Sequence, residues 1–301
     1  QEVGNPLEAI SSLSENHPYN KVGAENISVL AKEAKALLNR CGIKTTGNEE
    51  ANHYRLSPIG LAMPTWLTLE DMETLASAEE LKDKKVTLVN VVGFLDLPHH
   101  YALDNLRKAG AICSYKTIQL EEFDFARKSP TEMRASNLAK VIHDNGITDK
   151  LAQAINNVVD DADIVLLPAI IGLKNSSLSE KLREKVKANI KFIATMPPSV
   201  PGIRTLELLR QRLYELGGSI LMGDKATEGR FENGKLVEIK TEHLTDDSLR
   251  ADNFILASGS FMNKGLISNY THVYEPIFGL DVDAVADRND WYVENVFDAQ
   301  P

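Results

Sequence analysis

Short apolar segments alternate with helical segments in the middle of the chain, and this alternation constrains the fold more than any other feature. The apolar segments Val86–Val92 and Ile112–Leu120 flank a helical stretch around Leu103, and a third apolar run begins at Asp163. Strands that alternate with helices form mainly parallel sheets, and the helices cover the faces. We therefore predict an α/β fold class, with a doubly wound parallel domain over residues 84–217.

The pattern changes after Gly218. Two strand-like segments, Lys225–Phe231 and Lys235–Thr241, are separated by Asn233-Gly234. This residue pair is typical of two-residue hairpin turns, because both residues tolerate a positive φ. We expect an antiparallel β-meander here, followed by a final strand over Phe254–Leu256.

Four small residues, Ala257, Ser258, Gly259 and Ser260, follow the apolar segment Phe254–Leu256. Small side chains at the carboxyl end of a strand let another molecule approach the backbone closely, as nucleotides do in open α/β sheets. The alternative interpretation is a buried strand followed by an ordinary loop.

Charge and cysteine content exclude several classes of function. The chain has 43 Asp and Glu against 33 Lys and Arg, a formal charge of −10 that repels nucleic acid, so no nucleic-acid partner is expected. Its two cysteines, Cys41 and Cys113, lie far apart, so no metal site is expected. No apolar run approaches the length of a membrane-spanning helix, which predicts a cytoplasmic protein that contacts a membrane only through partners.

The segment Met196–Arg204, MPPSVPGIR, precedes a predicted helix. Free N–H groups at a helix start bind anions, and the forked Arg204 guanidinium suits a phosphate or carboxylate. Ser199, Gly202 and Arg204 are therefore candidates for an anion site that fits a phosphorylated three-carbon substrate. The alternative is a rigid turn in which Arg204 forms a surface salt bridge.

Histidines are the natural acid–base candidates, and His99 and His100 follow the strand segment Val86–Val92. A histidine pair at a helix start is more commonly structural, and nothing in the sequence fixes a geometry for proton transfer. The catalytic base is therefore left unassigned.

The meander and the strand that ends in Ala257–Ser260 resemble the second half of the flavin-binding domain in flavoproteins of the two-dinucleotide-binding-fold class. The resemblance implies that Lys225 and Ala226 lie on the adenine side of the cofactor. It also implies that Ala257–Ser260 lies against the pyrophosphate and flavin region.

Six sequence blocks resemble the B subunits of anaerobic glycerol-3-phosphate dehydrogenase, in the same order and over almost the whole chain. The blocks are His17–Tyr19, Arg134–Lys140, Val165–Leu173, Met196–Arg204, Ala257–Phe261 with Lys264–Leu266 just after it, and Glu275–Val282.

This resemblance implies a function and partners. It implies oxidation of sn-glycerol 3-phosphate to dihydroxyacetone phosphate, with electrons passed to quinone, and FMN, or else FAD, as cofactor. It also implies a catalytic sister flavoprotein subunit and an iron–sulfur subunit that docks the complex on the inner face of the cell membrane.

The chain departs from the family at both ends. The family begins with a Gly-rich dinucleotide turn and ends with a Gly-rich flavin segment, and this chain has no G-x-G-x-x-G after a strand. We therefore expect an interior segment of a longer protein that holds flavin weakly and is inactive alone. Residues 1–83 and 218–301 would then be parts of an incomplete flavin-binding domain around the insert at 84–217.

Two alternative functions remain open. In the first, the chain is a non-catalytic electron-relay or scaffold subunit of the same complex. In the second, residues 84–217 form a flavodoxin-like binding module.

Overall fold

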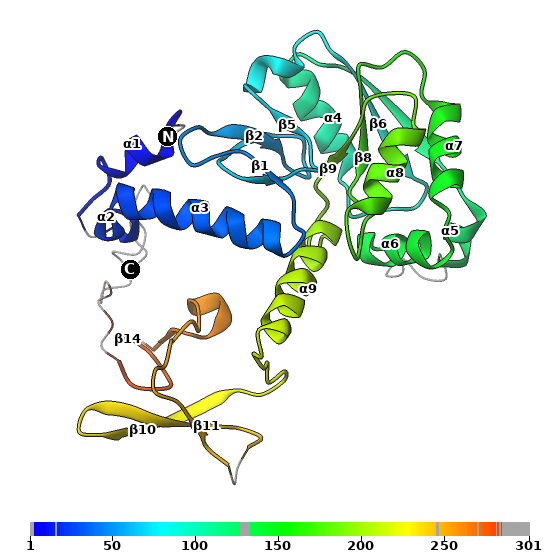
Figure 1. Ribbon diagram of the computed structural model, residues 1–301. Helices are drawn as coiled ribbons and strands as arrows, with labels where there is room; N and C mark the ends of the chain where they lie inside the picture. Colours follow the sequence, from blue (N-terminus) through cyan, green and yellow to red (C-terminus); the bar gives the residue numbers. More distant parts are fainter. Residues whose placement is uncertain are drawn as a thin grey trace. The chain divides into compact units, whose positions relative to one another are not determined.

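The computed structural model describes residues 3–15, 17–126, 133–244, 247–269, 271–280, 282 and 284 (Figure 1). The chain divides into two compact units, Gln1–Gly218 and Ser219–Pro301. The first unit contains α1 (Pro6–Ile10), α2 (Pro18–Val22), α3 (Ala24–Arg40), β1 (Thr45–Thr46), β2 (His53–Leu56), β3 (Ala62–Thr65), β4 (Thr68–Leu69), β5 (Thr74–Leu75), η1 (Ala78–Leu81), β6 (Lys85–Val91), α4 (His99–Lys108), β7 (Ile112–Ile118), α5 (Glu121–Ala126), α6 (Ala135–Asp144), α7 (Thr148–Val158), β8 (Ile164–Pro168), α8 (Ser177–Lys185), β9 (Ile190–Ile193) and α9 (Val200–Glu215). The second unit contains β10 (Ala226–Glu232), β11 (Lys235–Thr241), β12 (Leu249–Arg250), η3 (Phe261–Asn263), β13 (Ile267–Ser268) and β14 (Val273–Tyr274).

A four-stranded parallel sheet forms the core of the first unit. Its strand order is β7-β6-β8-β9, and every neighbouring pair runs parallel. In β6 every residue after Lys85 is buried, and four residues of β8 are buried as well. Strands that are buried on both faces read as continuous apolar runs, which is why the sequence pattern indicated them. The predicted parallel sheet is confirmed.

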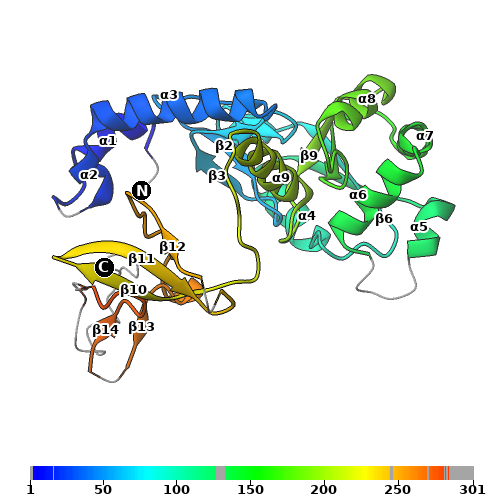
Figure 2. The ribbon, with the colours of Figure 1, turned by 60° about the horizontal axis from the view of Figure 1, so that its bottom comes forward.

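Helices cover both faces of this sheet. Figures 1 and 2 show α4 on one side and α7 and α8 on the other. The strand order explains this placement. The chain moves outward from β6 to β7 and then back past β6 to β8, and right-handed crossovers in opposite directions place their helices on opposite faces.

Residues before position 84 belong to the same compact unit as the parallel sheet. Met72 forms a parallel bridge with Phe192 of β9, and Glu73 N donates a hydrogen bond to Phe192 O at 2.9 Å. The small antiparallel sheet β3-β2-β5 continues from this junction. The assignment of residues 1–83 to a flavin domain therefore stays a prediction.

The second unit contains the predicted meander. Strands β10, β11 and β12 form an antiparallel sheet in that order. The turn between β10 and β11 has φ values of 51° at Asn233 and 76° at Gly234, as an Asn-Gly hairpin requires.

The predicted final strand over Phe254–Leu256 is wrong. These residues adopt no strand, and Ile255 and Leu256 are 93% and 42% exposed. A strand needs a lateral neighbour for its N–H and C=O groups, and in the described part of the chain Leu249–Arg250, not this segment, pairs with β11. The apolar composition of Phe254–Leu256 therefore does not indicate a strand here.

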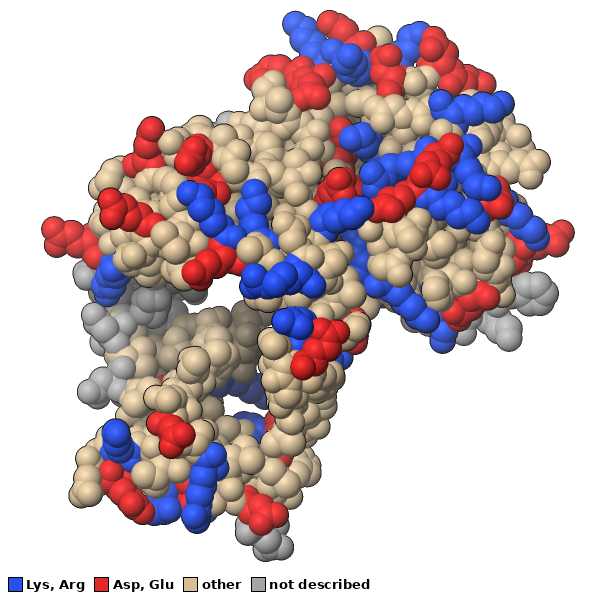
Figure 3. All heavy atoms as spheres, in the orientation of Figure 1, with Lys and Arg blue, Asp and Glu red and all other residues tan. Residues whose placement is uncertain are grey.

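Basic and acidic side chains lie intermixed on the face shown in Figure 3. Exposed ion pairs of the protein include Lys44–Glu180 and Lys181–Asp149. Within the described ranges, no helix is both long and apolar enough to cross a membrane. Those same ranges bring together no group of three or more His, Cys, Asp or Glu side chains that could hold a metal ion.

Candidate functional site

The small-residue loop Ala257–Ser260 lies on the surface of the second unit. Ala257, Gly259 and Ser260 are exposed and Ser258 is partly buried. Gly259 has a φ of 81°, a backbone conformation that glycine adopts without steric cost. Another molecule can therefore reach the peptide groups of this loop, as a cofactor-binding loop requires.

Gly265 fixes the position of this loop from the chain just after it. Its N–H donates a hydrogen bond to Ser260 O at 3.0 Å. A Cβ at position 265 would lie 2.6 Å from Gly259 O and 2.7 Å from Ser258 O, closer than folded backbones allow. Glycine at 265 thus lets the turn through η3 pack directly against the loop.

Lys225 and Ala226, the other predicted cofactor residues, lie where the hairpin begins. Lys225 is exposed, and Ala226 pairs with Thr241 across β10 and β11. Asp224 orders this end of the hairpin, because its carboxylate accepts hydrogen bonds from Thr241 Oγ1 at 2.6 Å, Lys225 N at 2.8 Å and His243 N at 3.0 Å. The hydrogen bond from Thr241 is the main reason that the pKa of Asp224 lies well below its usual value.

The pKa of Glu238 in β11 indicates how the stability of the hairpin responds to acid. It is 7% exposed, and its Oε2 accepts hydrogen bonds from Arg230 Nη2 at 2.9 Å and Arg250 Nε at 3.1 Å. The Arg230 hydrogen bond lowers the pKa of Glu238 from 4.5 to about 2. Because the pKa of Glu238 is lower in the folded chain than in the unfolded chain, its ionised form stabilises the fold at pH values above the unfolded pKa. This stabilisation is lost as the pH falls through the pKa of the folded chain.

We therefore expect the wild-type chain to lose more stability than Glu238→Gln between about pH 5 and pH 2. Urea denaturation of both chains at each pH measures the difference. Equal losses in the two chains would show that the carboxylate of Glu238 contributes nothing to this acid response.

The structure keeps Ser199 and Gly202 together and places Arg204 apart from them. Ser199 caps α9, since its Oγ accepts a hydrogen bond from Gly202 N at 3.2 Å, so the Gly202 N–H is not free as expected. Arg204 is 5% exposed and forms a buried ion pair, with its Nη2 2.7 Å from Asp71 Oδ2. The charge of Arg204, expected to be free for an anion, is thus already neutralised by Asp71. The alternative interpretation expected a salt bridge of Arg204 at the surface, but this ion pair is buried.

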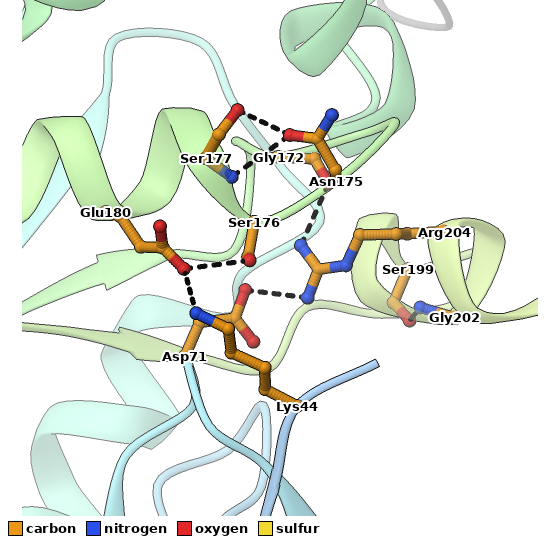
Figure 4. A network of polar contacts seen from close by, with 10 residues as sticks. All are labelled: Lys44, Asp71, Gly172, Asn175, Ser176, Ser177, Glu180, Ser199, Gly202 and Arg204. Atoms are coloured by element: carbon orange, nitrogen blue, oxygen red, sulfur yellow. Dashed lines mark hydrogen bonds and ion pairs between the residues drawn. The ribbon is translucent and has the colours of Figure 1, made fainter. Parts of the chain in front are cut away.

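The surroundings of Arg204 are built to fit it (Figure 4). Its Nη1 donates a hydrogen bond to Gly172 O at 2.9 Å. A Cβ at Gly172 would lie 2.7 Å from that Nη1 and 2.6 Å from Ser179 Oγ. Figure 4 shows the guanidinium directed toward Asp71 and Gly172, on the side away from Ser199.

The three residues predicted to form the anion site line two different pockets. Ser199 and Gly202 line a pocket at the carboxyl end of β9, together with Arg55 and Thr195. Arg204 lines another pocket, which Lys44 and Asp71 also border. Sequence reasoning missed Arg55 and Thr195, although the position of Thr195 directly after the apolar strand was a usable signal for a ligand-facing residue.

The histidine pair at the start of α4 has a stacking role. The ring of His99 lies 4.5 Å from the ring of Tyr115 and 4.2 Å from that of His100. Burial lowers the pKa of His99, which favours the neutral form of its ring. Asp96 in the preceding loop pairs with Arg134 at 2.7 Å, which ties the end of β6 to the start of α6.

Comparisons with known proteins cover nearly the whole chain. The model of the FAD binding domain family matches residues 5–301. The B subunit of anaerobic glycerol-3-phosphate dehydrogenase from Yersinia enterocolitica is 35% identical over 305 residues, which cover 100% of this chain and 72% of that protein. The B subunit from Pectobacterium atrosepticum is 31% identical over 100% of this chain and 72% of its own length. That from Actinobacillus succinogenes is 31% identical over 94% and 66%. No solved structure matches.

These matches confirm the resemblance read from the six sequence blocks, and the family model confirms a flavin-binding domain. The chain belongs to the FAD-binding domain family and, within it, to the B subunits of anaerobic glycerol-3-phosphate dehydrogenase.

Proposed function

We propose that this chain takes part in the flavin-dependent oxidation of sn-glycerol 3-phosphate to dihydroxyacetone phosphate, with electrons passed to quinone. Family membership supports the reaction, because the relatives are named as subunits of this dehydrogenase. The observation that carries the proposal for this chain is the accessible backbone of Ala257–Ser260, held in place by Gly265.

Residues of the second unit would hold the cofactor. The exposed peptide groups of Ala257–Ser260 would contact the pyrophosphate or phosphate end and the ring, and Lys225 and Ala226 would lie toward the opposite end. Lys225 is exposed, so a cofactor can reach its side chain. We propose FMN as the cofactor, with FAD as the alternative. A contact of Lys225 and Ala226 with adenine would favour FAD, because FMN has no adenine. When bound, the flavin supplies a two-electron acceptor for the hydride of carbon 2.

The substrate's phosphate would be held by the first unit, at the start of α9, where Ser199 and Gly202 lie. Arg204 would act there by fixing the position of α9 through its buried pair with Asp71. The catalytic base remains unassigned.

We further propose that the chain works as one component of a larger assembly. A catalytic sister flavoprotein subunit and an iron–sulfur subunit would be its partners, and the latter would dock the complex on the inner face of the cell membrane. The relatives are each named as one lettered subunit of the dehydrogenase, which supports an assembly of several chains.

An absorption spectrum and a dye-reduction assay test this function. We expect the purified full-length protein to show a flavin band in the blue and to reduce an artificial acceptor with glycerol 3-phosphate at a rate at least tenfold above that with glycerol. Heat release followed by chromatography identifies FMN or FAD. A missing flavin band contradicts the proposal. A bound flavin without turnover supports instead the electron-relay role.

A further inference from the structure

The pocket at the carboxyl end of β9 has the properties of a ligand site. Thr195 follows β9, Ser199 and Gly202 begin α9, and Arg55 of β2 and Thr68 of β4 complete its polar lining. Its volume is about 550 Å³, within the range of small-molecule sites. In open α/β sheets ligands bind at the carboxyl ends of the strands. We name this cavity the Thr195 pocket.

Thr195 lines this pocket, and its hydroxyl is buried without a hydrogen-bond partner among the described residues. Thr195 is 3% exposed. Its Oγ1 makes no hydrogen bond within the described part of the chain. A buried polar atom that has lost water and gained no partner is destabilising and is rare in folded proteins. A bound ligand with oxygen atoms would satisfy this hydroxyl, either as donor or as acceptor.

The charge of the Thr195 pocket is positive. Arg55 is the one charged side chain in its described lining, which contains no carboxylate. Arg55 is exposed, and its guanidinium has no hydrogen-bond or ion-pair partner within the described ranges. A planar guanidinium of this kind binds phosphate through two parallel hydrogen bonds.

The start of α9 adds to this charge. The helix has 16 residues and begins at the pocket, so its N-terminus carries a partial positive charge there. Ser199 Oγ already accepts a hydrogen bond from Gly202 N at 3.2 Å. The hydrogen of the Ser199 hydroxyl is therefore left to donate to a ligand.

We infer that the Thr195 pocket binds the phosphate group of a small phosphorylated molecule through Arg55 and the hydroxyls of Thr195 and Ser199. Leu67 and Met72 also line the pocket and would cover the carbon skeleton of the ligand. Arg55, and not Arg204, is thus the cation that would bind the phosphate in this pocket. That the ligand is glycerol 3-phosphate rests on the proposed function, whereas the binding of phosphate does not.

Calorimetric titration of the full-length protein with inorganic phosphate, glycerol 3-phosphate and glycerol tests this site. We expect both phosphates to bind and glycerol, which lacks the charge, to bind at least tenfold more weakly. Arg55→Gln should weaken phosphate binding at least tenfold, Arg55→Lys should restore part of the loss, and Thr195→Val should weaken binding severalfold.

Arg107→Gln is the matched control, because Arg107 is an exposed arginine of α4 that pairs with Asp104 and does not line the pocket. Its phosphate affinity should equal that of the wild type. The inference is overturned if Arg55→Gln, with an unchanged melting temperature, binds phosphate as tightly as Arg107→Gln. It is also overturned if the wild type does not bind phosphate at millimolar concentration.

The flavin band of the same samples separates the two proposals. Phosphate binding without a flavin band contradicts the proposed function and supports this site. A flavin band without phosphate binding contradicts this site alone.

Discussion

Replacing Asp71 by asparagine is expected to lower the free energy of unfolding by about 3–5 kcal/mol, because the charge of Arg204 would stay buried without its counter-charge. The two side chains are 6% and 5% exposed and lie 2.7 Å apart, so water cannot replace the lost carboxylate. Urea denaturation of the full-length protein, followed by circular dichroism, measures the loss. A fall of this size is a large part of the total stability of an ordinary domain.

Asp104→Asn provides the matched control. Asp104 pairs with Arg107 on the surface of α4, where the two side chains are 66% and 52% exposed. Exposed pairs contribute about 0–1 kcal/mol, so this variant should unfold close to the wild type. The double variant Asp71→Asn, Arg204→Met buries no unpaired charge and should recover part of the loss. An Asp71→Asn variant as stable as Asp104→Asn would show that the buried pair does not anchor α9.

This pair also shows what sequence reasoning could and could not find. The start of α9 was predictable, since Ser199 and the prolines around it are local signals that act within one turn. The partner of Arg204 was not predictable, because Asp71 lies 133 positions away and reaches Arg204 only through the fold. A guanidinium that reads as a free cation in the sequence is thus neutralised by a residue that no local pattern marks.

The strands also show what the sequence pattern can and cannot indicate. The central strands β6 and β8 are buried on both faces, so their apolar runs are long enough to be recognised in the sequence. The run Phe254–Leu256 is equally apolar but finds no lateral neighbour in the described chain, and Ile255 and Leu256 stay exposed. Composition indicates that a segment can enter a sheet, whereas the presence of a neighbouring strand decides whether it does.

The pocket residues follow this rule as well. Arg55 belongs to a short strand of the small sheet β3-β2-β5, and Thr195 belongs to the loop after β9. They line one cavity because the bridge between Met72 and Phe192 joins the small sheet to the parallel sheet. Arg55 lies in a stretch of the sequence with no sustained hydrophobic period, and so the sequence could not place it beside α9.

Gly265→Ala is expected to reduce the flavin content of the full-length protein at least tenfold. The added Cβ would lie 2.6 Å from Gly259 O and 2.7 Å from Ser258 O, so the backbone of the proposed cofactor loop must move. Both neighbours are backbone atoms, which cannot rotate away as a flexible side chain can. The flavin absorbance per mole of purified protein measures the effect.

Gly4→Ala is the control, since a Cβ at Gly4 would meet nothing within 4 Å. This variant should keep its flavin. Phosphate titration separates a local effect from general unfolding, because Gly265 lies in the second unit and phosphate binding reports on the first. If Gly265→Ala retains full flavin while its melting temperature is unchanged, the loop Ala257–Ser260 does not contact the cofactor. If it loses flavin but still binds phosphate, the substitution has acted on the cofactor loop and has left the first unit folded.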